Sequence, residues 1–339
     1  MRKGWAFRPF WIRLSKRVFL LFLTLVLAGC GPLSYPPHLA VAFAKNIGHN
    51  REDLWVGQFS AQGHLRGPLW NLGALGLVAQ EEIMTAHGGT LWVTTGYAIW
   101  AMTPGRQPHV AVRAPKGMTL LAVSYLGGHL WVVAERLNAL HVRIYEWNHG
   151  LRLRTRTPLA ITTLVPAPGG TVAVLSADPN HATITRIGAH VLQHWTVDSP
   201  PQGTLAFGQA RGYLPVTSGL RGFDMVTIPA NRGRIFKRYP YPSVWRAVIA
   251  VMPTNPPYGL TVKGIVPLRA GQAQWKNQKP WPHPLQATMT TDGTGPGWAL
   301  IVDGPSQGFW FNAQKDQFGP AFVVQAPAGA FARAVTPWP

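Results

Sequence analysis

Six polar residues follow short apolar segments that recur along the chain, and their side chains could do chemistry. They are Glu135, Arg136, Asp178, His181, Arg221 and Asp303. Carboxylates and imidazoles transfer protons and ligate cations, whereas guanidinium groups bind anions. The chain lacks the phosphate-binding motif G-x-x-x-x-G-K-[ST] and the dinucleotide fingerprint G-x-G-x-x-G. The pattern therefore predicts a ligand-binding set at these six positions, with no catalytic residue assigned and no cofactor.

Histidines are numerous enough to raise the question of a metal site, because the chain has 12 of them. None stands in the H-x-H or H-E-x-x-H spacing that places two imidazoles on one ion. Asp178 and His181 are separated by Pro and Asn, a composition typical of a turn. We therefore predict a turn at this position and no metal site.

The elements that must hold these side chains recur about every 41 residues. Each unit contains a β-branched or aromatic segment after a Gly-rich turn, with further short segments separated by Gly, Pro, Asn and Asp. The repeated segments are EDLWV (52–56), GGTLWV (88–93), GGHLWV (127–132), GGTVAV (169–174), RGYLPV (211–216), YGLTV (258–262) and GWALI (297–301). In the first three segments Trp and aliphatic residues are adjacent, so both faces of these strands are expected to be buried.

Four short strands in each unit predict an all-β fold, a β-propeller of about seven four-stranded blades over residues 38–339, with six or eight blades as alternatives. The repeats resemble the G-x-L-W-V repeats of bacterial sensor and quinoprotein-like propellers. We expect Trp55, Trp92 and Trp131 to pack between blades, and the final segment (329–339) to close the ring by pairing with the first blade. Pro215 conflicts with this assignment, because a central strand needs its backbone N–H.

The N-terminal segment predicts where in the cell the protein is located. Residues 1–17 carry six basic residues and no acid, and an 11-residue apolar segment (18–28) follows that is short for a membrane span. Leu27-Ala28-Gly29-Cys30 resembles the lipobox of bacterial lipoproteins, in which the chain is cut before a lipidated cysteine. The resemblance implies a signal peptide at 1–29, a tether at 30–37 with its lipid on Cys30, and a location on the outer face of a bacterial membrane. Cys30 is the only cysteine of the chain, so no intrachain disulfide forms.

The charge balance is strongly basic, with 31 Lys and Arg against 12 Asp and Glu and a net charge of +19. No clustered basic reading motif accompanies it, so we predict no nucleic-acid binding. The scarcity of carboxylates is consistent with an acidic environment, and equally with a basic surface that faces anionic lipid or wall polymer. The candidates for a basic rim, on segments in the fourth position of their units, are Arg152, Arg154, Arg156, Arg234, Lys237 and Arg238. Protection of an outer strand edge explains the same residues.

Together these features favour a non-enzymatic binding or scaffold propeller that is anchored to the membrane by lipid. Its partner would be an envelope protein or an anionic polymer. The alternative is a propeller enzyme of the lyase, lactonase or glycosidase class with its active site at the mouth of the central channel. A third possibility is an assembly factor without a small-molecule site.

Overall fold

The chain divides into two compact units, Met1–Tyr35 and Pro36–Pro339. The computed structural model describes residues of the second unit. They are 38–49, 51–76, 83–126, 128–136, 142–157, 160–188, 191–208, 211–217, 222–229, 237–242, 248–252, 254, 257–261, 264–269, 272–273, 279–280, 287–290, 298–303, 307–313 and 315–338. The predicted signal peptide and Cys30 lie outside this part of the chain. Among the described residues, no helix is long and apolar enough to cross a membrane.

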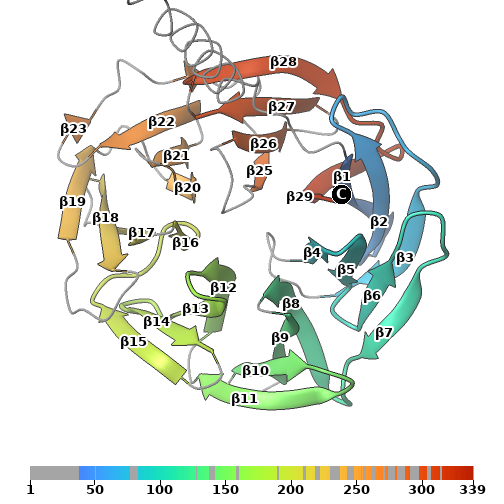
Figure 1. Cartoon of the computed structure of the whole chain (residues 1–339), viewed down its shortest axis with the longest axis horizontal. Helices are drawn as coiled ribbons and strands as arrows, with labels where there is room; N and C mark the ends of the chain where they lie inside the picture. The colour runs from blue at the N-terminus through green and yellow to red at the C-terminus, as the bar shows by residue number, and fades with distance from the viewer. Residues whose placement is uncertain are drawn as a thin grey trace, which may run out of the picture. The chain divides into compact units, whose positions relative to one another are not determined.

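The described strands form seven antiparallel sheets arranged in a ring (Figure 1), which confirms the predicted β-propeller. Blade 1 contains, from the inside outward, β29 (Ala330–Pro337), β1 (His38–Gly48), β2 (Arg51–Ser60) and β3 (Trp70–Leu75). Blade 2 contains β4 (Met84–His87), β5 (Thr90–Thr94), β6 (Ala98–Met102) and β7 (His109–Arg113). Blade 3 contains β8 (Met118–Leu126), β9 (His129–Arg136), β10 (Val142–Trp147) and β11 (Leu151–Thr157).

The remaining four blades follow in chain order around the ring. Blade 4 contains β12 (Ala160–Ala167), β13 (Thr171–Ala177), β14 (Ala182–Ile187) and β15 (Val191–Val197). Blade 5 contains β16 (Ala206–Phe207), β17 (Arg211–Thr217), β18 (Gly222–Pro229) and β19 (Lys237–Pro242). Blade 6 contains β20 (Val248–Met252), β21 (Tyr258–Thr261), β22 (Gly264–Arg269) and β23 (Gln272–Ala273), and β24 (Lys279–Pro280) also pairs with β22. Blade 7 contains β25 (Ala287–Thr290), β26 (Trp298–Asp303), β27 (Gln307–Asn312) and β28 (Gln317–Val323).

Alternate residues of a central strand pack against opposite neighbours, which explains why both faces of the repeated segments are apolar. In β9, Leu130 and Val132 belong to the cluster that joins blades 2 and 3, whereas Trp131 and Val133 belong to the cluster that joins blades 3 and 4. Successive side chains of a strand point to opposite faces, so a blade between two neighbours has no wet face. The core is therefore a ring of interfaces between blades.

The tryptophans of the repeats pack between blades at two of the three predicted positions. Trp131 is buried between blades 3 and 4. The Trp92 ring stacks on Tyr125 of the next blade with centroids 4.9 Å apart. Trp55 differs, because the segment that contains it is β2, the third strand of blade 1, whereas the other repeated segments are second strands.

The first repeated segment therefore does not occupy the position of the others: it forms the third strand of its blade and not the second. Blade 1 takes its innermost strand from the C-terminus, since β29 pairs with β1 and brings Ala334 opposite Ala42. The second position then falls to β1, which in the sequence follows Tyr-Pro-Pro and not a Gly-Gly pair. The predicted closure of the ring by the final segment is confirmed.

Pro215 is tolerated because the ladder on its inner side is interrupted. The Pro215 carbonyl accepts a hydrogen bond from the backbone N–H of Gln202 at 2.9 Å. A residue in a strand directs its N–H and its carbonyl toward the same neighbour. The missing N–H of Pro215 would thus face the inner side, where β16 pairs only with Gly212 and Tyr213.

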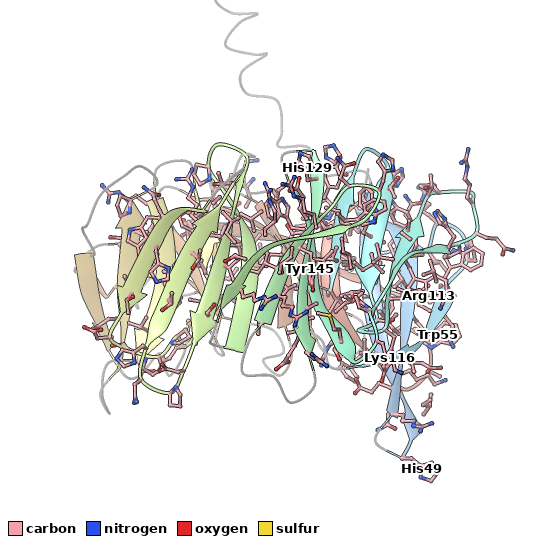
Figure 2. The ribbon with its side chains drawn as sticks, turned by 90° about the horizontal axis from the view of Figure 1, so that it is seen from below. His49, Trp55, Arg113, Lys116, His129 and Tyr145 are labelled. Carbon is pink, nitrogen blue, oxygen red and sulfur yellow. The ribbon has the colours of Figure 1, made fainter. Side chains whose placement is uncertain are left out.

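The ring has two faces, which we name upper and lower as they lie in Figure 2. His129, at the start of β9, lies at the upper face. His49, after β1, and Lys116, between β7 and β8, lie at the lower face. Because the strands alternate in direction, the turns between second and third strands belong to the lower face, and the turns between third and fourth strands belong to the upper face.

Candidate functional site

The predicted channel-mouth residues that the structure describes lie at the ends of second strands or in the turn that follows one. Glu135 and Arg136 end β9, and Asp178 and His181 flank the turn between β13 and β14. Asp303 ends β26, but its side chain lies outside the described part of the structure, as does Arg221. β9 and β13 are the second strands of neighbouring blades, and both run from the upper face to the lower face.

The Asp178 side chain holds a turn. Its Oδ1 accepts hydrogen bonds from the backbone N–H groups of Asn180 at 2.7 Å and His181 at 2.6 Å. The Asp178 N–H donates to the His181 carbonyl at 3.0 Å, and the His181 Nδ1 lies 3.3 Å from the carboxylate. The hydrogen bond from the Asn180 N–H is the largest cause that lowers the pKa of Asp178, and the His181 N–H and ring add to it. The carboxylate is thus engaged within its own turn, as the composition predicted.

Glu135 and Arg136 lie in the blade before that turn. Glu135 is half-buried and stands opposite Thr119 on one side and Val142 on the other, while Arg136 is exposed. Across the described ranges, no three His, Cys, Asp or Glu side chains are grouped so that they could hold a metal ion.

Residues 304–308 read Gly-Pro-Ser-Gln-Gly, a match to the G-x-S-x-G pattern of serine hydrolases. That motif acts at a sharp turn from a strand to a helix. Here the flanking elements are two antiparallel strands, with Asp303 of β26 opposite Gln307 of β27. The motif is therefore flanked by a strand on each side, with no helix after it, and the match gives no nucleophile assignment.

The predicted basic rim falls on outer strands. Arg152 and Arg156 of β11 are exposed, but Arg154 is engaged, because its Nε lies 2.9 Å from the Glu146 carboxylate. A bulge in the pairing of β10 and β11 leaves Arg154 without an opposite residue and interrupts the strict alternation of the three arginines. Lys237 and Arg238 lie on β19, also an outer strand, with side chains that fall outside the description, and Arg234 lies in an undescribed segment.

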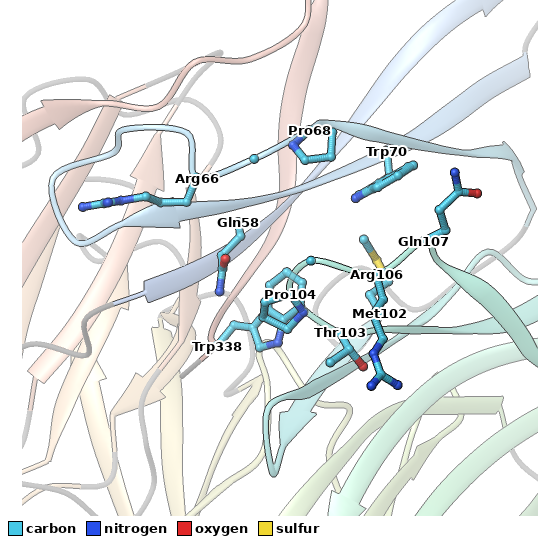
Figure 3. A pocket seen from close by; sticks show the side chains of 12 residues that line it. Gln58, Arg66, Pro68, Trp70, Met102, Thr103, Pro104, Arg106, Gln107 and Trp338 are labelled. Carbon is cyan, nitrogen blue, oxygen red and sulfur yellow. The ribbon is translucent and has the colours of Figure 1, made fainter.

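A pocket of about 470 Å³ opens between blades 1 and 2, away from the channel mouth. We name it the seam pocket (Figure 3). It lies toward the upper face, because it is built from the loop after β2 and the turn after β6. Its lining residues are Gln58, Arg66, Gly67, Pro68, Trp70, Met102, Thr103, Pro104, Gly105, Arg106, Gln107 and Trp338.

One wall of the seam pocket is a loop that folds back on its own strand. The Arg66 N–H donates to the Gln58 carbonyl at 2.7 Å, and Leu65 forms an isolated bridge with Phe59. Phe59 is fully buried, so it anchors the loop to the core. These contacts place Gln58, Arg66 and Pro68 at one edge of the pocket.

The opposite wall is a tight turn whose sequence dictates its shape. The Arg106 N–H donates to the Thr103 carbonyl at 3.1 Å, which closes the four residues Thr103-Pro104-Gly105-Arg106. Pro104 sets the first central position, and Gly105 has φ +74°, a value that suits glycine. Pro followed by a residue of positive φ is the signature of a type II turn. The turn holds Thr103, Pro104 and Arg106 against the pocket.

The floor is aromatic and apolar. Trp338 is only 3% exposed, and its indole Nε1 donates to the Gly89 carbonyl at 3.0 Å. Met102 is buried, and half-buried Trp70 packs against the same core cluster. Figure 3 shows the Gln58 amide extending toward Trp338, whereas the guanidinium groups of Arg66 and Arg106 extend outward from the pocket. Flat apolar surfaces with a few polar groups are typical of a small-ligand site.

Sequence reasoning missed this pocket for a physical reason. Its walls come from turns outside the repeated segments, and its floor needs Trp338, which reaches blade 2 only after the ring closes. One signal was available, since the predicted pairing of the final segment with blade 1 places Trp338 beside that blade. Trp70 and the Pro-Gly turn carried no pattern that joins them to it.

Comparison with solved structures supports the fold. The chain is similar to a protein from Lactobacillus plantarum, with 10% identity over 89% of this chain and 99% of that chain and a TM-score of 0.58. It is also similar to virginiamycin B lyase from Staphylococcus aureus, with 10% identity over 72% of this chain and 84% of that chain and a TM-score of 0.54. BamB from Moraxella catarrhalis matches with 14% identity over 90% of this chain and 91% of that chain, at a TM-score of 0.49.

Identities this low show the shared fold alone. No family model matches the chain, and no curated protein matches its sequence.

Proposed function

We propose that the chain is a binding propeller, held by lipid on Cys30 at the outer face of a bacterial membrane, that recognises an envelope component without transforming it. The proposed location is supported by the basic N-terminal segment, the short apolar segment and Leu27-Ala28-Gly29-Cys30. A single acyl chain gives marginal membrane binding, so the proposed anchor needs more than one chain.

The observation that carries the binding role is the seam pocket. Its volume of about 470 Å³ falls within the range of small-ligand sites, and apolar faces and amide groups converge on it. The Asp178 carboxylate of the predicted channel-mouth set is, by contrast, engaged by the backbone of its own turn. The described groups therefore favour recognition at the seam over proton transfer at the channel mouth.

The basic character of the chain supports an anionic partner. Without the proposed signal peptide, which carries six of the 31 basic residues and no acid, the net charge is 25 minus 12, or +13. This charge and the exposed Arg152 and Arg156 on an outer strand would attract an acidic envelope polymer or protein. Attraction of this kind raises the association rate and weakens as salt is added.

Fractionation of cells tests the anchor. The native chain, Cys30→Ala and the matched tether variant Ser34→Ala are expressed in a bacterium that processes lipoproteins, and the membranes are washed with alkaline carbonate. We expect the native chain and Ser34→Ala to stay in the membrane and Cys30→Ala to be released. Retention of Cys30→Ala as firmly as the native chain, and at the size of the processed native chain, would contradict the lipid.

Capture from intact envelope tests the binding role. The native chain is expected to retain an envelope component that Trp70→Leu loses and that Arg113→Ala, a change of an exposed arginine outside the seam pocket, keeps. The bound component should be recovered chemically unaltered after long incubation. Its conversion to a product would favour the propeller-enzyme alternative over a binding protein.

A further inference from the structure

The seam pocket combines features that rarely serve packing alone. Trp70 in its floor is half-buried, the Gln58 amide extends into it, and Thr103 and Gln107 add a hydroxyl and a second amide. No carboxylate is among its lining residues, while two arginines are. Neither Arg66 nor Arg106 has an ion-pair partner among the described residues.

We propose that the seam pocket binds an acidic saccharide, with one sugar ring on the aromatic floor and the acidic groups of adjoining units on the two arginines. A pyranose ring has an apolar C–H face and a rim of hydroxyl groups. The apolar face suits the flat surfaces of Trp70 and the prolines, and the hydroxyls suit side-chain amides, which both donate and accept.

The direction of the arginines argues for a chain of sugar units over a single small anion. Both guanidinium groups extend outward from the pocket (Figure 3), so they would meet groups that project beyond the unit held inside. Guanidinium groups form strong, often bidentate hydrogen bonds with carboxylate and phosphate. A peptide strand is less suited, because most of the lining residues lie in loops and turns, and β2, β3 and β6 contribute one residue each.

The short tether between Cys30 and the first strand favours a saccharide that lies near the membrane. This step rests on the proposed lipid anchor at Cys30. The Trp338 N–H donates to the His38 carbonyl at 3.0 Å, so the pocket floor is fixed to the first strand residue after the tether. Seven residues separate Cys30 from His38, and the eight steps between their Cα atoms span at most about 28 Å. The same acidic saccharide could thus belong to a free wall polymer or to a glycolipid headgroup.

A glycan array is the first test, with the full-length protein in detergent micelles and immobilised uronic-acid, phosphate-bearing and neutral oligosaccharides. Binding is expected on acidic members and on none of their neutral counterparts. Absence of binding to every acidic member would overturn the proposal whether or not Cys30 carries lipid. Binding to immobilised acidic peptides in place of the sugars would also overturn it.

Titration calorimetry with the strongest acidic oligosaccharide then tests the residues. Trp70→Leu, which keeps apolar volume without a flat ring, should weaken binding at least tenfold, and Trp70→Phe should stay within about threefold. Arg66→Ala and Arg106→Ala should each weaken it about three- to tenfold and reduce its salt dependence. Arg113→Ala is the matched control and should leave affinity unchanged.

Thermal melting of each variant separates lost binding from lost folding, since Trp70 also packs against the core. If Trp70→Leu melts like Trp70→Phe and still binds fully, the pocket is not the site. Flotation with vesicles, with and without a uronic-acid glycolipid, distinguishes the two sources when it is done with Cys30→Ala. Flotation only with the glycolipid indicates a headgroup, and binding of the free oligosaccharide alone indicates a wall polymer.

Discussion

Trp338 and Gly89 are 249 residues apart in sequence, yet the indole Nε1 of Trp338 donates a hydrogen bond to the Gly89 carbonyl at 3.0 Å. Trp338 follows β29, the inner strand of blade 1, and Gly89 lies in the turn before β5 of blade 2. A second bond of the same kind joins Trp310 of blade 7 to the Ala61 carbonyl of blade 1 at 2.8 Å. Blade 1 is therefore tied to both neighbours by indole groups, in addition to the pairing of β29 with β1.

Trp338→Phe should weaken this closure. The substitution removes the donor and leaves an apolar ring, at a cost of about 1 kcal/mol for the hydrogen bond. The midpoint of urea unfolding is expected to fall, and Trp310→Phe should lower it by a similar amount. An unchanged midpoint in both variants would show that strand pairing alone closes the ring.

Gly105→Ala should strain the turn that forms one wall of the seam pocket. Gly105 has φ +74°, and an L residue in the left-handed region costs roughly 1–2 kcal/mol. A Cβ at this position meets no atom within 4 Å, so the penalty is conformational and not steric. We expect a lower melting temperature and a weaker affinity for the pocket ligand.

Gly150→Ala is the matched control for that substitution. Its Cβ also meets nothing within 4 Å, and its φ is not positive. The melting temperature of Gly150→Ala should stay close to that of the native chain. Equal losses in the two variants would contradict the turn assignment.

Arg154 and Glu146 should show a measurable coupling in a double-mutant cycle. The Arg154 Nε and the Glu146 Oε2 are 2.9 Å apart, with side chains 17% and 12% exposed, and an Arg154 guanidinium nitrogen donates to the Gly188 carbonyl of blade 4 at 3.4 Å. Partial burial limits screening, so a coupling of about 0.5–1 kcal/mol is expected in urea unfolding.

Arg156→Ala provides the contrast on the same strand. Arg156 is exposed and stands opposite Arg143, so its removal relieves a like-charge pair. Stability should stay level or rise slightly. A loss as large as that of Arg154→Ala would show that the charge of the strand, and not the ion pair with Glu146, is what matters.

The sequence was sufficient to predict the architecture because the repeated strands are buried on both sides. Trp131 and its aliphatic neighbours meet two adjacent blades, so burial leaves an apolar pattern that recurs with every blade. Blade 1 does not follow this pattern. The C-terminal β29 supplies its inner strand, so Trp55 lies on the third strand of the blade and not on the second. A repeat in the local sequence cannot show that a strand from the other end of the chain joins the blade.

The binding site could be predicted only in part. Turn chemistry was sufficient for Asp178 and His181, because an Asp before Pro and Asn favours hydrogen bonds to its own backbone. The seam pocket brings together Gln58, Thr103 and Trp338, which no periodicity links. Their proximity depends on the packing of blade 1 against blade 2 and on closure of the ring.

The turn at Asp178 gives a prediction about pH. Hydrogen bonds from the Asn180 and His181 N–H groups stabilise the ionised carboxylate and lower its pKa below the ordinary value of 3.8. A group whose pKa is lower in the folded state stabilises the fold above its unfolded pKa and loses that contribution as the pH falls through the folded value. The amide signals of Asn180 and His181 should therefore titrate with a midpoint below 3.8 between pH 5 and pH 2, as followed by NMR. Asp178→Asn keeps an acceptor that does not titrate, so the same signals should stay flat in that variant. A midpoint at or above 3.8 would contradict the hydrogen bonds that define this turn.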